Sequence, residues 1–226
     1  MVEKLLKPAE FAEKQLLEAI LGLKYNPGEV LPAERLLAIE LGVTRPTLRE
    51  TLQRLSKEGW ITIRHGKPTK VNDYLKNGGL GILSSLARYG KNLSTDMVSH
   101  LLEVRTVMFP DIAQKAISNS PEEILTYLRK SNALKNRADA YAEYDWGLQM
   151  LMVKATKNPV FNMILNDFEP LYAILGEIYF QKKNARVASL TYYSDLIKAL
   201  EQNNMDIKLL VEETMIHTQK IWEKIR

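Results

Sequence analysis

Two short segments of the chain carry side chains that are suited to binding DNA. Arginine has a forked guanidinium group that can donate to guanine O6 and N7 together, which is worth roughly 1–3 kcal/mol of base discrimination. A hydroxyl group near a helix N-terminus suits phosphate, and a glycine in a turn lets the backbone approach the duplex closely. The residues of these types are Thr44, Arg45, Thr47 and Arg49 in the first segment, and His65, Gly66 and Lys67 in the second.

The positive charge of the chain is concentrated around these two segments. The stretch from Thr44 to Lys70 holds seven basic and two acidic residues, a net charge of +5, against +4 for the whole chain. Such a local excess is typical of a surface that meets phosphate. The alternative interpretation is that the arginines form a solvated helix face and that His65-Gly66 is only a turn.

Local patterns predict the elements that would position these side chains. Apolar residues at helical spacing predict a first helix over residues 8–23. A second helix is expected over residues 32–42, with a proline in its first turn and a glycine at its end. A third is expected over residues 44–59, with a threonine as its N-cap. The β-branched runs at residues 60–63 and 69–72 predict a hairpin, so the order is that of a winged helix-turn-helix.

The remainder of the chain is predicted to be helical. From Leu80 to Arg226 apolar residues recur at helical spacing without a convincing strand, which favours an all-α bundle of six or seven helices. Ser120-Pro121-Glu122-Glu123 has the residues of a helix start. Pro110 is expected to kink or break a helix, and Pro170 to mark a helix boundary. The fold class is therefore mainly α, with a small β-hairpin wing in the N-terminal part.

These elements divide the chain into three parts. Residues 1–74 are predicted to form the winged helix-turn-helix DNA-binding domain, and residues 75–90 a linker helix. Residues 91–226 are predicted to form the all-α effector domain. Asn77-Gly78-Gly79 is the expected hinge, because paired glycines interrupt regular structure.

Composition narrows the function classes. The chain has no cysteine, which excludes disulfides, thiolate metal sites and thiol nucleophiles. No stretch resembles a signal peptide or approaches the ~20 apolar residues of a membrane span, so a cytoplasmic protein without a membrane partner is expected. No nucleophile and base are paired, and Gly78-Gly79-Leu80-Gly81 is too short for a nucleotide-binding loop. We therefore predict that the protein is not an enzyme.

Aromatic residues are frequent in the second half of the chain. At helical spacing such a set forms either an ordinary hydrophobic core or the wall of a ligand pocket, and the spacing alone favours the core. The residues concerned are Tyr172, Tyr179, Phe180, Tyr192, Tyr193 and Trp222.

Three runs of residues resemble the signature of the GntR superfamily of bacterial transcription regulators. They are Leu31-Pro32-Ala33-Glu34-Arg35, the run from Gly42 to Glu50, and Gly59-Trp60-Ile61. The run from His65 to Asn72 further resembles the fatty-acid-responsive FadR branch of that superfamily, and the similarity extends to the C-terminus. The resemblance implies a homodimer that binds a palindromic operator in double-stranded DNA.

The resemblance also implies the DNA contacts. The residues that would contact operator phosphates and bases are Arg35, Thr44, Arg45, Thr47 and Arg49. His65 and Gly66 would serve the minor groove, with Lys67 adding charge beside them. Pro46 departs from the FadR pattern, which has a threonine there, so one hydrogen bond to DNA is absent and a slightly different operator preference is expected.

The effector that the FadR resemblance implies is a long-chain fatty acyl-CoA. The matched residues that would line or flank its pocket are Leu102, Arg105, Asp145, Tyr172, Tyr179, Tyr193 and Trp222. Each buried methylene contributes roughly 0.8 kcal/mol, so a long chain could supply on the order of 10 kcal/mol before ordering costs. Arg105 would either anchor the thioester and CoA end or pair with Asp145, and the residues alone do not choose between these roles.

Many related effector domains bind a metal through an aspartate, a histidine four residues later and two further histidines. In this chain Asp145 is followed at that distance by Gln149, and Tyr193 stands where another histidine is expected. Only His217 lies near a histidine position of the pattern. One imidazole cannot build the usual transition-metal site, so neither a metal nor a cofactor is expected.

The favoured hypothesis is a repressor of fatty-acid degradation genes that leaves its operator when acyl-CoA binds, and activation of synthesis genes stays open. Acyl-CoA would favour a dimer whose DNA-binding domains are wrongly spaced for the operator. One alternative is a regulator that responds to an organic acid or another small metabolite. The other is an acyl-CoA-using enzyme fused to a DNA-binding domain.

Overall fold

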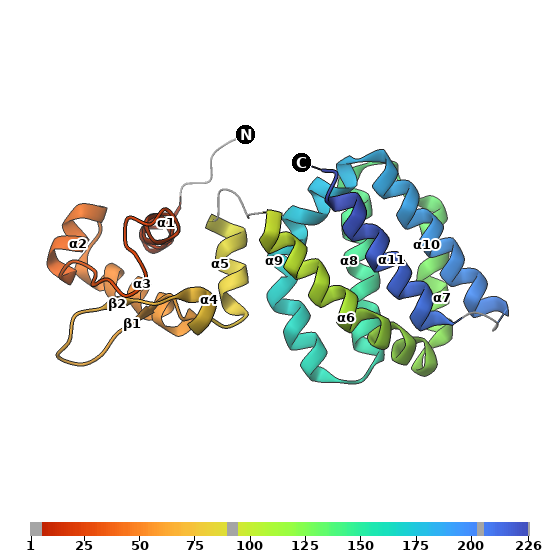
Figure 1. The fold of residues 1–226 in the computed structure, drawn as a ribbon, viewed down its shortest axis with the longest axis horizontal. Helices are drawn as coiled ribbons and strands as arrows, with labels where there is room; N and C mark the ends of the chain where they lie inside the picture. Colours follow the sequence, from red (N-terminus) through yellow and green to blue (C-terminus); the bar gives the residue numbers. More distant parts are fainter. Residues whose placement is uncertain (1–5, 90–94, 203–205, 226) are drawn as a thin grey trace. The chain divides into compact units, whose positions relative to one another are not determined.

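The computed structural model describes residues 6–89, 95–202 and 206–225 (Figure 1). The chain divides into two compact units, Met1–Asn92 and Leu93–Arg226. The elements of the first unit are α1 (Pro8–Leu21), α2 (Glu34–Leu41), α3 (Arg45–Glu58), β1 (Ile61–Thr62), β2 (Lys70–Val71), α4 (Tyr74–Asn77) and α5 (Gly81–Tyr89).

Three helices form the centre of the first unit. α1 and α3 pack together through buried leucines, which include Leu16 of α1 and Leu52 of α3. α2 packs on α3 and ends at Gly42, whose φ of +65° is the left-handed conformation that glycine adopts without strain. Pro32 lies before the first turn of α2 instead of inside it, because Ala33 is the N-cap.

The third helix begins and ends as predicted. The Thr44 side chain accepts a hydrogen bond from the Thr47 amide at 3.3 Å, and Pro46 lies in the first turn, where a missing N–H costs nothing. Gly59 ends the helix with a φ of +97°. A Cβ atom there would lie 3.1 Å from Gly78 Cα, so glycine also permits a close backbone approach.

The wing is a two-stranded antiparallel sheet that is shorter than the predicted hairpin. Ile61 pairs with Val71 and Thr62 with Lys70, and Val30 adds an isolated bridge to Lys70. The strands start from Trp60, which is fully buried. The N-terminal unit is therefore a winged helix-turn-helix, as the sequence predicted.

The stretch expected to form a linker helix contains α4 and α5, with Gly78-Gly79 between them. α5 packs on α1. In addition, the Ser85 hydroxyl donates a short hydrogen bond to the Glu58 carboxylate at the end of α3. α5 is thereby tied to the winged helix-turn-helix by packing and by a hydrogen bond.

The second unit is a bundle of helices, in agreement with the predicted all-α fold. Within the described residues its centre lies between α6, α8, α9, α10 and α11, and Figure 1 shows α6 and α11 side by side. None of its described helices is long and apolar enough to cross a membrane. Its elements are α6 (Thr95–Asn119), α7 (Pro121–Arg129), the 3₁₀ helix η1 (Lys130–Ala133), α8 (Ala138–Ala155), α9 (Pro159–Gln181), α10 (Lys183–Gln202) and α11 (Ile207–Trp222).

Two prolines lie inside helices, where the sequence predicted interruptions. Pro110 is within the continuous helix α6, and Pro170 is within α9, so the expectation of a helix boundary at Pro170 is wrong. An internal proline removes one backbone hydrogen bond and crowds the preceding turn. At Pro110 the flanking Phe109, Ile112 and Ala113 are buried, and the packing of this apolar face outweighs the local cost.

Candidate functional site

The predicted DNA-contacting residues of the helices lie at the surface of one unit. Arg45 and Arg49 are exposed and one helical turn apart on α3, whereas Leu48 between them is buried. Residues four apart on a helix are neighbours, so the two guanidinium groups share one face. Arg35 is exposed in the first turn of α2, and Thr44 is exposed at the N-terminus of α3. This arrangement presents bases and hydroxyls at the N-terminal end of a helix whose other face is buried.

Arg49 is held by an ion pair that the sequence patterns did not indicate. Its Nε donates to the Glu34 carboxylate of α2 at 2.7 Å, with side chains that are 64% and 38% exposed respectively. A pair this exposed contributes little to stability, at most about 1 kcal/mol. Its effect is on geometry, because it orients one arginine of α3 from the neighbouring helix.

The wing tip carries the second predicted segment. His65, Gly66 and Lys67 are all exposed, and the Lys67 amide donates to the Arg64 carbonyl at 3.1 Å to close a tight turn. Gly66 has a φ of +68°, which side-chain-bearing residues rarely adopt. No atom lies within 4 Å of the place where its Cβ would be. The glycine is therefore required by backbone conformation, and the open space beside it admits a partner.

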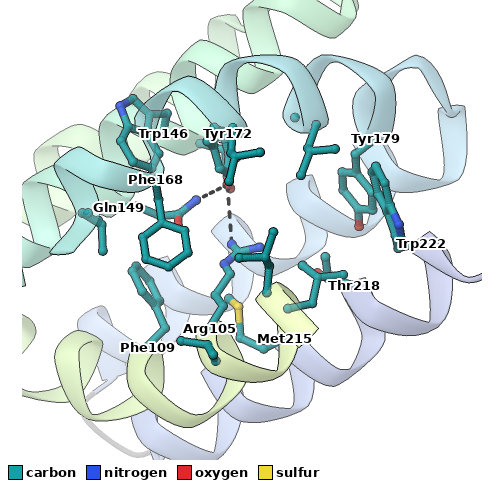
Figure 2. A pocket seen from close by; sticks show the side chains of 18 of the residues that line it. Arg105, Phe109, Trp146, Gln149, Phe168, Tyr172, Tyr179, Met215, Thr218 and Trp222 are labelled. Carbon is teal, nitrogen blue, oxygen red and sulfur yellow. Dashed lines mark hydrogen bonds and ion pairs between the residues drawn. The ribbon is translucent and has the colours of Figure 1, made fainter. Parts of the chain in front are cut away.

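The second unit contains a cavity between α6, α8, α9, α10 and α11 (Figure 2). Its volume is about 140 Å³, whereas one water molecule needs roughly 10–15 Å³ on the same scale, so it is far larger than a hydration site. Most of its wall is aliphatic or aromatic. The predicted effector residues that line it are Leu102, Arg105, Asp145, Tyr172, Tyr179 and Trp222.

The remaining predicted residue, Tyr193, does not line the cavity but lies behind its polar wall. Tyr193 is fully buried, and its hydroxyl donates to Asp145 Oδ1 at 2.7 Å. Asp145 Oδ2 accepts from the Tyr172 hydroxyl at 2.5 Å and from Gln149 Nε2 at 2.7 Å. Arg105 Nη2 lies 3.6 Å from the same oxygen (Figure 2). We call these five side chains the Asp145 cluster.

The Asp145 cluster keeps a carboxylate satisfied in an apolar surrounding. A buried charge needs a counter-ion and hydrogen-bond donors to offset its lost hydration. Burial and the neighbouring Asp145 carboxylate raise the pKa of Tyr172 and of Tyr193 well above the ordinary tyrosine value, so both hydroxyls remain protonated donors. Arg105 lines the cavity and pairs with Asp145, which is one of the two roles left open by the sequence. Its other role, as the anchor of a thioester and CoA end, stays a prediction.

Several lining residues were not anticipated from the sequence, among them Phe109, Trp146 and Phe168 (Figure 2). On α9 the lining residues recur every three or four positions, which is a signal that the sequence contains. Tyr179 stacks on Trp222 with ring centroids 6.3 Å apart, which joins α9 to the last turn of α11. The periodicity identifies the inner face of each helix, but not which faces share a cavity.

The position four residues after Asp145, which a metal-binding pattern would fill with a histidine, contributes an amide to the cluster. Gln149 donates to Asp145 from the same helix, α8. Within residues 6–89, 95–202 and 206–225, no three His, Cys, Asp or Glu side chains are grouped so that they could hold a metal ion. The groups around Asp145 are hydroxyls and an amide, which donate to its carboxylate, and a guanidinium, which forms an ion pair with it.

Comparison with known proteins connects both units to families. Residues 8–71 match the model of bacterial regulatory proteins of the gntR family, and residues 72–226 match that of the FadR C-terminal domain. A fatty acid metabolism regulator protein of Shewanella halifaxensis is 39% identical over 97% of this chain and 92% of its own length. The protein of the same name from Klebsiella pneumoniae is 38% identical over 100% of this chain and 95% of its own length.

A solved structure agrees with the fold. Lar, described as controlling the expression of the Listeria monocytogenes agr system, matches with a TM-score of 0.67 over 99% of this chain and 100% of that chain, at 16% identity. This likeness concerns the fold alone. From the two family models and the relatives of nearly full length, the chain belongs to the GntR family of bacterial regulatory proteins and, within it, to the group with a FadR C-terminal domain.

Proposed function

We propose that this protein is a DNA-binding regulator of transcription in fatty acid metabolism, and that a long-chain acyl-CoA bound in the cavity releases it from operator DNA. Regulators of this family are not normally enzymes. The observation that carries the proposal is an apolar cavity, enclosed by five helices, in a domain of the FadR type. The relatives, which are named fatty acid metabolism regulator proteins, support the choice of effector.

The cavity wall fits an alkyl chain. Its lining includes Leu101, Leu102 and Met108 of α6 and Phe168 and Leu175 of α9, all without a charged or hydrogen-bonding group. Each methylene transferred from water contributes roughly 0.8 kcal/mol, so affinity should rise steeply with chain length. Free coenzyme A lacks the acyl chain that would supply these methylenes. A long-chain ester is therefore the expected effector, and a short-chain ester should bind poorly.

In the DNA complex, two copies of the chain bind one palindromic operator. Each copy presents α3 to the major groove and the wing tip to the minor groove. A ligand changes this binding only if it binds the released state more tightly than the DNA-bound state. A coupling of about 1–3 kcal/mol corresponds to a 5- to 150-fold loss of operator affinity.

The test is a titration of the protein–operator complex. The operator is a palindromic duplex selected by the protein from a random pool, and fluorescence anisotropy follows its release. Palmitoyl-CoA is expected to release it with about a 5- to 150-fold loss of affinity, whereas butyryl-CoA and free CoA leave it bound. Complexes that palmitoyl-CoA does not release would exclude the acyl-CoA assignment.

A variant with a filled cavity separates ligand binding from DNA binding. Leu102→Trp adds bulk inside the cavity, so the variant is expected to bind the operator normally while palmitoyl-CoA no longer releases it. Val107→Trp is the matched control, because Val107 lies on the same helix, does not line the cavity and is 76% exposed. Equal responses of both variants to palmitoyl-CoA would place the ligand elsewhere.

The ion pair of Arg49 predicts a further effect on base preference. Glu34→Gln removes the charge that orients Arg49, so discrimination at the base pair read by Arg49 is expected to relax by up to about fivefold while the stability changes by less than about 1 kcal/mol. Anisotropy with single-base variants of the operator measures this. The control is Glu40→Gln, which breaks the exposed Lys24–Glu40 pair of α2 without touching α3. An equal loss of affinity for every single-base variant of the operator would argue against an orienting role of Glu34.

A further inference from the structure

The cavity holds two polar atoms that the protein itself does not satisfy. In the described part of the second unit, the buried side-chain nitrogen and oxygen atoms without a hydrogen-bond partner are Arg105 Nε and the Tyr192 hydroxyl. Both residues line the cavity. A buried polar group without a partner costs roughly 1–3 kcal/mol, and such groups are rare in native proteins. Two of them on residues that line one cavity indicate a partner that occupies it.

Tyr192 is the more informative of the two. It is only 5% exposed, so water outside the protein does not solvate its hydroxyl. Burial raises the pKa of Tyr192, and the Asp145 carboxylate raises it further, against a smaller opposite effect of Arg105. The hydroxyl therefore stays protonated, and it can donate a hydrogen bond to a ligand.

The neighbouring tyrosines show that the free hydroxyl is specific to this position. Tyr193 and Tyr172 both donate to Asp145, and Tyr127 donates to the Tyr144 carbonyl at 3.0 Å. The Asp145 carboxylate already accepts three hydrogen bonds besides its ion pair, which leaves little capacity for a fourth donor. Tyr192 thus has no acceptor in the cluster beside it.

We propose that Tyr192 is a specificity-determining residue: its hydroxyl, together with Arg105 Nε, donates to an acceptor oxygen carried by the acyl group of the ligand. This inference rests on the proposed function. Two sources of such an oxygen share the chemistry. One is the thioester carbonyl of an acyl-CoA, and the other is an oxygen substituent further along the alkyl chain. A purely hydrocarbon occupant leaves both donors unsatisfied and binds less tightly.

The experiment compares three ligands on the full-length protein by isothermal titration calorimetry. They are palmitoyl-CoA, its thioether analogue S-hexadecyl-CoA, which lacks the carbonyl, and a palmitoyl-CoA analogue with a ketone in the middle of the chain. If the thioester carbonyl is the partner, the wild type binds palmitoyl-CoA about 2- to 10-fold more tightly than the thioether, the effect of one net hydrogen bond. If a chain oxygen is the partner, the ketone analogue binds more tightly than palmitoyl-CoA by a similar factor.

Tyr192→Phe is expected to abolish the difference in affinity between palmitoyl-CoA and its analogue that the wild type shows. The same variant is expected to raise the melting temperature of the ligand-free protein by about 2–4 °C, because it removes an unsatisfied buried hydroxyl. Tyr127→Phe is the matched control, since it deletes a hydroxyl that has a partner and lies outside the cavity lining. It should lower the melting temperature and leave the ligand preference unchanged.

Two results would overturn the inference while leaving the proposed function in place. One is a set of affinity ratios that Tyr192→Phe does not change. The other is a fall in the melting temperature of Tyr192→Phe like that of Tyr127→Phe, which would mean that the hydroxyl has a partner within the protein. If none of the three ligands binds to the wild type, the proposed function fails and this inference fails with it.

Discussion

Replacing Arg45 with alanine is expected to weaken operator binding about 5- to 150-fold. An arginine that reads a base contributes roughly 1–3 kcal/mol to binding, and this free energy corresponds to that loss of affinity. Arg45 is the first residue of α3, and its side chain is exposed. The substitution should therefore leave the free energy of unfolding and the melting temperature almost unchanged. Anisotropy titrations with the selected operator measure the affinity. The same titrations with random duplex show how much of that affinity depends on the base sequence.

The control for Arg45→Ala lies on the same helix. Lys57→Ala removes an exposed positive charge 12 residues later, about 18 Å along the helix axis. It should reduce binding slightly and equally for all sequences, because at that distance only long-range attraction to phosphate is affected. If Arg45→Ala also weakened the selected and the random duplex equally, Arg45 would contact phosphate and would not read a base.

Replacing Asp145 with alanine is expected to cost about 3–5 kcal/mol of unfolding free energy. The substitution leaves the Arg105 charge without its counter-ion, and the Arg105 side chain is only 21% exposed. Removing one partner of a buried pair is costly because the other charge stays in an apolar surrounding. The hydroxyls of Tyr172 and Tyr193 lose their acceptor as well. Chemical denaturation that follows the effector unit measures the loss.

The same helix provides a matched surface substitution. Asp139→Ala also removes an aspartate that is paired with an arginine, Arg137, but both side chains are more than half exposed. It should cost less than about 1 kcal/mol. Adding Arg105→Met to Asp145→Ala should recover part of the loss, because it removes the unpaired charge. Equal costs for the two aspartates would mean that the Asp145 cluster does not stabilise the fold.

Short-range patterns predicted the DNA-binding unit well. The Thr44 cap, the left-handed Gly42 and Gly59 and the tight turn at Gly66 are each decided within a few residues, so the sequence contains the information that places them. The order of these elements also predicted the winged helix-turn-helix. The Glu34–Arg49 pair joins residues 15 apart on two helices, and it appears only when α2 and α3 have been packed together.

The prolines of the second unit show where local rules fail. Pro110 and Pro170 lie within helices because burial of the flanking apolar residues outweighs the loss of one backbone hydrogen bond. Likewise, helical periodicity marks the inner faces of α6, α9 and α11 but not the cavity that they enclose together. That cavity depends on how the helices cross, which is a property of the packed bundle.

By itself, then, the sequence determined the family, the winged helix-turn-helix followed by an all-α bundle, and several of the residues that line the cavity, because local geometry and motif spacing carry that information. The tertiary structure alone decided how the polar atoms are paired. Tyr192 and Tyr193 are adjacent and chemically identical, yet Tyr193 reaches Asp145 from 48 positions away while the Tyr192 hydroxyl has no partner among the described residues. Successive side chains on a helix point about 100° apart, so the surrounding bundle gives one tyrosine an acceptor and leaves the other without one.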